Sequence, residues 1–94
     1  MLNENDFTLQ RTLMIDRANK VAASQQWHIL NVRFLSNPKD SHLMFVTVKC
    51  LDKSDSKPFA TALFNNSSST GFFVEGHYDF ETEEAATNDM VRRR

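Results

Sequence analysis

The middle of this chain alternates like a series of β-strands, yet these strands are apolar on both faces. Residues 27–35, 42–51, 59–65 and 72–80 alternate with a period of two, and their even-numbered positions are almost all apolar. The odd-numbered positions should then be polar, because a sheet with one face in water alternates cleanly. Large apolar side chains recur there instead: Trp27, Ile29, Leu35, Leu43, Phe45, Leu51, Phe59, Leu63 and Phe73. A sheet built from these strands therefore needs cover on both faces.

One long helix is available to cover the first face. Residues 4–25 contain no Gly or Pro, and they follow Asn3, a residue type preferred at helix N-caps. Apolar side chains recur at spacings of three, four and seven, which is typical of a helix with one buried side. This stripe consists of Phe7, Met14, Ala18, Val21 and Ala22. Leu9 and Leu13 lie off the stripe, and they predict either a broad apolar face at a sheet edge or a contact between molecules.

The connections between the strands predict an antiparallel sheet. Each connection is six or seven residues long, whereas a parallel crossover needs a dozen or more. We therefore expect an α+β domain over residues 1–80, with the helix on the even-numbered face of a four-stranded meander. Helix-backed meanders also occur in cystatin-like folds, which is an analogy of architecture only. Residues 81–94 are acidic and then arginine-rich, and they predict a short helix or a disordered tail.

The second face of the sheet is the main clue to function. Turns centred near residues 39, 55 and 68 give a trial register that mixes large apolar side chains with single polar ones, as protein interfaces do. We expect another molecule to cover this face, most simply a second copy of the chain. The alternative is that the C-terminal segment folds over it, although only Met90 and Val91 there are large and apolar. The predicted contact residues are Trp27, Ile29, Phe45, Phe59, Leu63 and Phe73.

Charge is distributed unevenly along the chain, although the net charge is only −1. Residues 58–91 carry six acids and no Lys or Arg, and Arg92, Arg93 and Arg94 follow them. An acidic surface of this kind can meet a basic partner, while a solvated tail is the simpler interpretation. The acidic contact residues predicted from this segment are Asp79, Glu81, Glu83 and Glu84.

The sequence contains no recognisable catalytic, metal or cofactor signature. His28, His42 and His77 match no zinc-binding spacing, and the single Cys50 has no second thiolate to act with. With two glycines in the whole chain, a glycine-rich loop that cradles phosphate is excluded. We therefore expect neither an enzyme nor a bound cofactor or metal.

These patterns favour a small non-enzymatic binding or regulatory protein, an inhibitor or adaptor encoded by a bacterium or phage. We expect it to act through its sheet face as a homodimer. The lone cysteine, and the lack of a signal sequence or a long apolar run, predict a cytoplasmic protein without membrane contact.

Two alternatives stay open. In one, a cone-shaped domain holds a small molecule, or acts as an enzyme, in a pocket between helix and sheet near His28, His42 or Tyr78. In the other, the chain binds nucleic acid through its sheet. This second alternative is disfavoured because acidic residues share the strand face with the few aromatic and basic ones.

Overall fold

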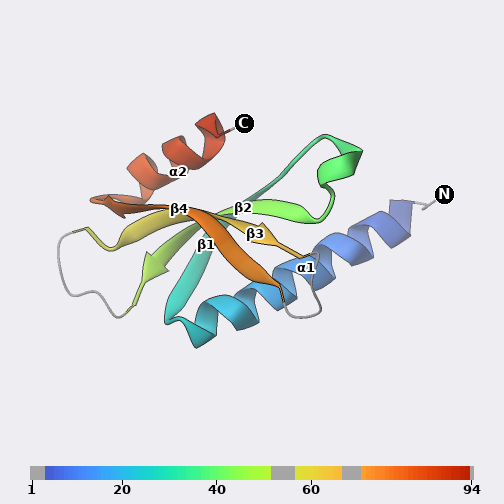
Figure 1. The fold of residues 1–94 in the computed structure, drawn as a ribbon, viewed down its shortest axis with the longest axis horizontal. Coiled ribbons are helices and arrows are strands. Elements are labelled where there is room, and N and C mark those ends of the chain that lie inside the picture. The colour runs from blue at the N-terminus through green and yellow to red at the C-terminus, as the bar shows by residue number, and fades with distance from the viewer. Residues whose placement is uncertain (1–3, 52–56, 67–70, 94) are drawn as a thin grey trace.

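The structure, a computed structural model, describes residues 4–51, 57–66 and 71–93, with side chains from Leu9 onward. Its elements are α1 (Glu4–Ser24), β1 (Trp27–Phe34), the 3₁₀ turn η1 (Pro38–Asp40), β2 (Leu43–Cys50), β3 (Phe59–Asn65), β4 (Phe72–Phe80) and α2 (Glu83–Arg92). The strands form one antiparallel sheet in the order β1-β2-β3-β4 (Figure 1). The predicted α+β fold, with a long N-terminal helix, a meander and a short C-terminal helix, is confirmed.

The two helices cover opposite faces of the sheet, so the molecule has a core on each side (Figure 1). Even-numbered positions of β2 and β3 face α1, as the sequence predicts, because they are the more apolar set. The buried residues of the α1 side are Met14, Ala18, Met44, Val46, Val48, Cys50, Ala60, Ala62 and Phe64. Those of the α2 side are Leu43, Phe45, Leu63 and Met90.

The chain's own C-terminal helix, α2, covers the second face of the sheet. The expectation that another molecule covers this face is therefore wrong for the residues buried beneath α2. α2 begins at a favourable N-cap, since the Thr82 side chain accepts a hydrogen bond of 3.0 Å from the backbone N–H of Ala85. Ala86 and Met90 are the buried residues of α2. Counting large apolar side chains in the C-terminal segment underestimated this cover, because Ala86 lets the helix backbone lie close to the sheet.

A bulge in β1 separates residues that the trial register placed together. Asn31 pairs with Thr47, as that register predicted, but Trp27 pairs with Cys50, and the pairing shifts between Ile29 and Asn31. A shift of one residue turns the side chains beyond it to the other face of the sheet. Trp27 and Ile29 therefore pack against the α1-side core.

β4 carries two further irregularities. Glu75 and Asp79 have positive φ angles of 53° and 68°, and the pairing of β3 with β4 shifts twice along the strand. Phe73 pairs with Phe64 and packs on the α1 side, while the shift beyond it brings His77 opposite Thr61 on the α2 side. Left-handed residues are uncommon outside glycine, so Glu75 and Asp79 are weak markers of these bulges, and the one glycine of the strand, Gly76, lies beside Glu75.

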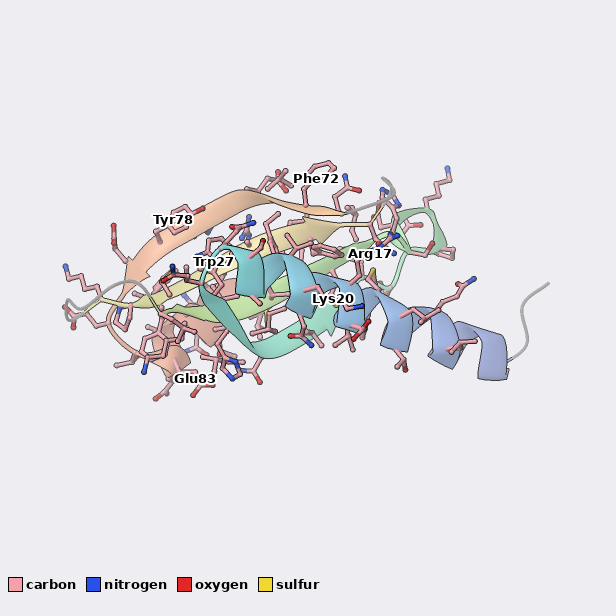
Figure 2. All side chains as sticks on the ribbon, turned by 90° about the horizontal axis from the view of Figure 1, so that it is seen from below. Arg17, Lys20, Trp27, Phe72, Tyr78 and Glu83 are labelled. Carbon is pink, nitrogen blue, oxygen red and sulfur yellow. The ribbon has the colours of Figure 1, made fainter. Side chains whose placement is uncertain are left out.

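α1 is longer than the part of the sheet that it covers. Its 21 residues correspond to a length of about 31 Å at 1.5 Å per residue. Among the described side chains of α1, those before Met14 are all outside the core, and the buried ones are Met14, Ala18 and Ala22. The N-terminal half of the helix therefore projects past the end of the sheet (Figures 1 and 2).

Candidate functional site

A groove of about 930 Å³ lies between α1 and the end of the sheet where η1 connects β1 to β2. It forms because the projecting helix leaves the strands while the chain after β1 turns back toward β2. Its apolar lining residues are Leu13, Met14, Phe34, Leu35 and Leu43. A partly open groove with this lining suits the apolar side of another chain segment.

Two exposed leucines stand beside this groove. Leu9 is 56% exposed and Leu13 is 58% exposed, and the spacing of four puts them on one side of α1. Leu13 also lines the groove. The sheet edge does not cover these side chains, so the interpretation as a broad buried face is wrong, while a contact between molecules stays a prediction. We call Leu9, Leu13 and the groove the α1 surface.

Basic side chains of α1 give the groove a positive rim (Figure 2). Nη1 of Arg17 donates a hydrogen bond of 2.6 Å to Oδ1 of Asn66, which anchors the guanidinium at the wall. The guanidinium of Arg11 lies 4.4 Å from the centre of an aromatic ring in β1. Nζ of Lys20 lies 3.2 Å from Oδ2 of Asp16 in an exposed ion pair. An apolar groove edged by these bases is complementary to an apolar segment that also carries acids.

A polar network fastens α2 to the sheet on the opposite side of the molecule. Oδ2 of Asp89 accepts a hydrogen bond of 2.8 Å from Oγ1 of Thr61, and Nδ1 of His77 lies 2.8 Å from the same oxygen. An ionised carboxylate can only accept, so His77 is the donor. Nη1 of Arg93 donates to Oγ1 of Thr61 at 3.2 Å. This network ties α2 to both β3 and β4.

Arg33 of β1 holds the C-terminal end of α2. Its Nε and Nη2 donate to the carbonyl oxygen of Met90 at 3.3 and 3.1 Å, and Nη2 also donates to that of Arg93. A cation is favourable there because the last carbonyls of a helix carry partial negative charge. The guanidinium carbons of Arg33 and Arg93 lie 4.9 and 4.8 Å from the ring centre of Phe45. Binding of nucleic acid through this face would need its basic and aromatic side chains to be open, but Arg33 and Phe45 are engaged within the fold.

Asp89 is expected to make the protein less stable in acid. Burial raises the pKa of its carboxyl group, but hydrogen bonds from Thr61 and His77 and attraction to His77 and Arg93 outweigh burial and hold the pKa below its ordinary value. Such a group contributes stability above its unfolded pKa of about 4, and this contribution is lost as pH falls through the lower folded pKa. The free energy of unfolding should therefore decrease below about pH 4.

Urea unfolding of Asp89→Asn at pH 7 and at about pH 2.5 checks this expectation. At pH 7 the substitution should lower the free energy of unfolding by about 1–3 kcal/mol, because it weakens two charge-assisted hydrogen bonds. In acid the difference from wild type should shrink, since both side chains are then neutral. Asp16→Asn, at an exposed acid of α1, is the control and should change little at either pH. An equal cost of Asp89→Asn at both pH values would contradict the role of the ionised carboxylate.

The six contact residues predicted from the sequence divide between the two faces of the sheet. Phe45 and Leu63 are buried beneath α2, with Phe45 only 1% exposed, and Phe59 is half-buried. The half-buried residues on the α1 side are Trp27, Ile29 and Phe73. The rings of Trp27 and Phe73 pack against each other at a tilt of 53°, with ring centres 5.3 Å apart. The prediction that the six form one surface is wrong, because the bulge in β1 turns Trp27 and Ile29 away, and the pairing of Phe73 with Phe64 puts Phe73 on the α1 side.

The predicted acidic contact residues lie together where β4 ends and α2 begins. Their side chains are exposed, and Figure 2 shows Glu83 at the surface. Oε1 of Glu83 also accepts a long hydrogen bond of 3.4 Å from Nδ2 of Asn31. The residues are Asp79, Glu81, Glu83 and Glu84. Their role in binding a basic partner stays a prediction.

The residues proposed to line a small-molecule pocket do not converge. His42 lines the groove beside α1, but His28 is exposed near the opposite end of β1. Tyr78 is exposed on β4 and packs against Trp27, with ring centres 6.2 Å apart (Figure 2). Among residues 4–51, 57–66 and 71–93, no three His, Cys, Asp or Glu side chains are grouped so that they could hold a metal ion.

Comparisons of this chain with protein-family models, curated proteins and solved structures find no match. Within the part of the chain that the structure describes, no helix has the length and apolar character needed to cross a membrane. Function is therefore inferred from the geometry and chemistry of the site.

Proposed function

We propose that this chain is a non-enzymatic binding protein that contacts another protein through its α1 surface. The observation that carries the proposal is the pair of exposed leucines, Leu9 and Leu13, beside an apolar groove with a basic rim. Contact through α1 replaces the sheet-face contact expected from the sequence, because α2 occupies much of that face. As part of this proposal, the protein acts as an inhibitor or adaptor in the cytoplasm of a bacterium, encoded by the bacterium or by a phage.

The exposed leucines favour a protein partner over a small molecule. The groove volume of about 930 Å³ and the presence of His42 in its wall support a small-molecule site as the second candidate. A small ligand in the groove would leave Leu9 in water, however, since that side chain does not line the groove. A partner helix laid along the groove covers both leucines and the apolar lining together, which is a common mode of protein recognition.

Site-specific photo-crosslinking in the native host tests the proposal. A photoreactive phenylalanine analogue in place of Leu13 is expected to form a discrete adduct with a protein, because Leu13 lies at the proposed contact. The matched control is the same analogue at Leu51, which is 59% exposed just after the opposite end of β2. In a second arm, Leu13→Glu should abolish the adduct formed from an analogue at Leu9.

The two positions together decide the outcome. A discrete protein adduct from position 13 and none from position 51 supports the proposal. An absence of protein adducts from position 13, or equal adducts from both positions, contradicts it.

A further inference from the structure

We infer that the partner segment bound at the α1 surface is an acidic amphipathic helix of about three turns, whose carboxylates face Arg17 and Lys20. This inference rests on the proposed function, since it gives the chemistry of the occupant of the same surface. It follows from the charge of the groove, from the contacts that hold its bases, and from the order of apolar and basic residues along α1.

The groove is positively charged, although the protein as a whole is slightly acidic. Among the described residues that line the groove, the charged ones are Arg11, Asp16, Arg17 and Lys20, with a formal charge of +2. The whole chain carries −1, so the rest of the chain carries −3. Like charges that face each other across an interface are unfavourable. The groove therefore attracts an acidic segment and disfavours a basic one.

Contacts within the fold hold two of these bases in place. The guanidinium of Arg11 lies 4.4 Å from the ring centre of Phe34. Nη1 of Arg17 donates a hydrogen bond of 2.6 Å to Oδ1 of Asn66. An aromatic ring and a side-chain amide are both uncharged, so these contacts position the guanidinium groups without forming ion pairs. Bases that are already positioned lose less side-chain entropy when an acid binds to them.

The third base, Lys20, is paired with an acid that a partner can replace. Its Nζ lies 3.2 Å from Oδ2 of Asp16, and the two side chains are 78% and 62% exposed. Ion pairs as exposed as this one contribute little to stability. A carboxylate of a bound helix can therefore take the place of Asp16 with little loss of free energy.

Apolar and basic side chains follow one another along one side of α1. Leu9, Leu13 and Arg17 are spaced by four, and Lys20 comes about one turn after Arg17 (Figure 2). This stripe is apolar at its beginning and basic at its end. Leu9 and Lys20 are 11 residues apart, which corresponds to about 17 Å along the helix. A partner helix of about three turns covers the stripe when its apolar side chains lie beside the leucines and its acids beside the bases.

The apolar lining favours such a helix over other polyanions. Phosphates of a nucleic acid or of a lipid surface would also be attracted to Arg17 and Lys20. They would leave the concave apolar wall, which includes Met14 and Leu43, without cover. An acidic amphipathic helix supplies the carboxylates and the apolar side chains together.

Two synthetic peptides and the purified full-length protein test the inference. Each peptide has about 18 residues, the same leucine stripe and a hydrocarbon bridge that keeps it helical. The polar positions are all glutamate in the acidic peptide and all lysine in the basic peptide. Fluorescence anisotropy should show that the acidic peptide binds at least about tenfold more tightly than the basic one. Added salt should weaken its binding.

Matched variants locate the binding site. Lys20→Glu should reduce the preference for the acidic peptide about fivefold, and Arg17→Glu with Lys20→Glu should reverse it. Lys49→Glu makes the same change of charge at an exposed base near the end of β2 away from η1, and it should leave the preference unchanged. Circular dichroism checks that each variant is folded. Lys20→Glu alone decides the result if the double variant unfolds through loss of the hydrogen bond from Arg17 to Asn66.

Several outcomes overturn the inference. They are equal binding of the two peptides, tighter binding of the basic peptide, binding of neither, equal effects of Lys20→Glu and Lys49→Glu, or binding of anionic vesicles or an oligonucleotide in place of the acidic peptide. Each is distinct from failure of the proposed function. If the photoreactive residue at position 13 still forms a discrete protein adduct, the α1 surface binds a protein of different chemistry. If it forms no protein adduct, the proposed function itself fails.

Discussion

A chain that ends at Thr82 is expected to lose cooperative folding, although it retains all four strands and α1. Without α2, the buried side chains of Phe45 and Leu63 would be exposed and Met90 would be absent. Each such side chain contributes about 1.5–3 kcal/mol when it is buried, or roughly 4–9 kcal/mol for the three. A domain of this size has a total stability of only about 5–14 kcal/mol. α2 and its polar network therefore account for most of the free energy of unfolding of this domain.

Urea unfolding and binding of a hydrophobic dye measure this effect. The shortened chain should show dye binding in water and no cooperative transition. Two substitutions in the intact chain show the contribution of α2 to stability. Met90→Ala should lower the free energy of unfolding by about 2–5 kcal/mol. Val91→Ala, at an exposed neighbour in α2, should lower it by less than about 0.5 kcal/mol. If the shortened chain unfolds cooperatively at the wild-type urea concentration, residues 1–80 form a complete domain, and the second face of the sheet is again available to a partner.

Phe45→Ala is expected to lower the free energy of unfolding by about 3–5 kcal/mol, as large-to-small changes at buried aromatic residues do. The Phe45 ring is 1% exposed, and it contacts both the apolar core under α2 and the guanidinium groups of Arg33 and Arg93. Its removal leaves a cavity and also takes away the surface on which two cations stack. Both effects weaken the docking of α2, so the transition should broaden as well as shift.

Phe72→Ala is the matched control for this substitution. Phe72 is 43% exposed at the start of β4 (Figure 2), so its removal should cost less than about 1 kcal/mol. Thermal and urea unfolding of both variants give the comparison. Equal costs for the two phenylalanines would contradict the placement of Phe45 between the sheet and α2.

The two helices have different roles, which follow from their contacts with the sheet. α2 is short, but hydrogen bonds from all four strands fix both its side and its end to the sheet. α1 is long, and its contacts with the sheet are mainly with β1. The helix that completes the fold is therefore α2, while α1 presents the surface that we propose for binding.

Local sequence patterns predicted the elements of this fold closely. Period-two alternation in the middle of the chain, polar connections too short for a crossover, and a first helix without Gly or Pro place every strand within a residue or so of its observed bounds. Leu9 and Leu13 were also marked by sequence, because they fall outside the helical stripe. These features can be predicted from the sequence because each depends only on residues that are neighbours along the chain.

The positions of the bulges could not be predicted from local sequence patterns. A bulge is marked most clearly by glycine at a left-handed position, but here non-glycine residues, Glu75 and Asp79, adopt positive φ. A shift of one residue then reverses the face of every side chain beyond it. That is why Trp27 and Ile29 lie on the side opposite to the one predicted, whereas Phe73 lies there because it pairs with Phe64 next to the β3–β4 connection.

The sequence by itself determined the long first helix, the strands, their antiparallel order and the presence of two apolar faces, since these follow from local periodicity and loop length. Only the tertiary structure decided what covers the second face and where the groove lies. Both depend on contacts between residues far apart in the chain, such as Thr61 with Asp89 and Arg33 with Met90. A hydrogen bond between residues far apart in the chain produces no periodic pattern in the sequence. Its two partners are brought together only when the chain folds.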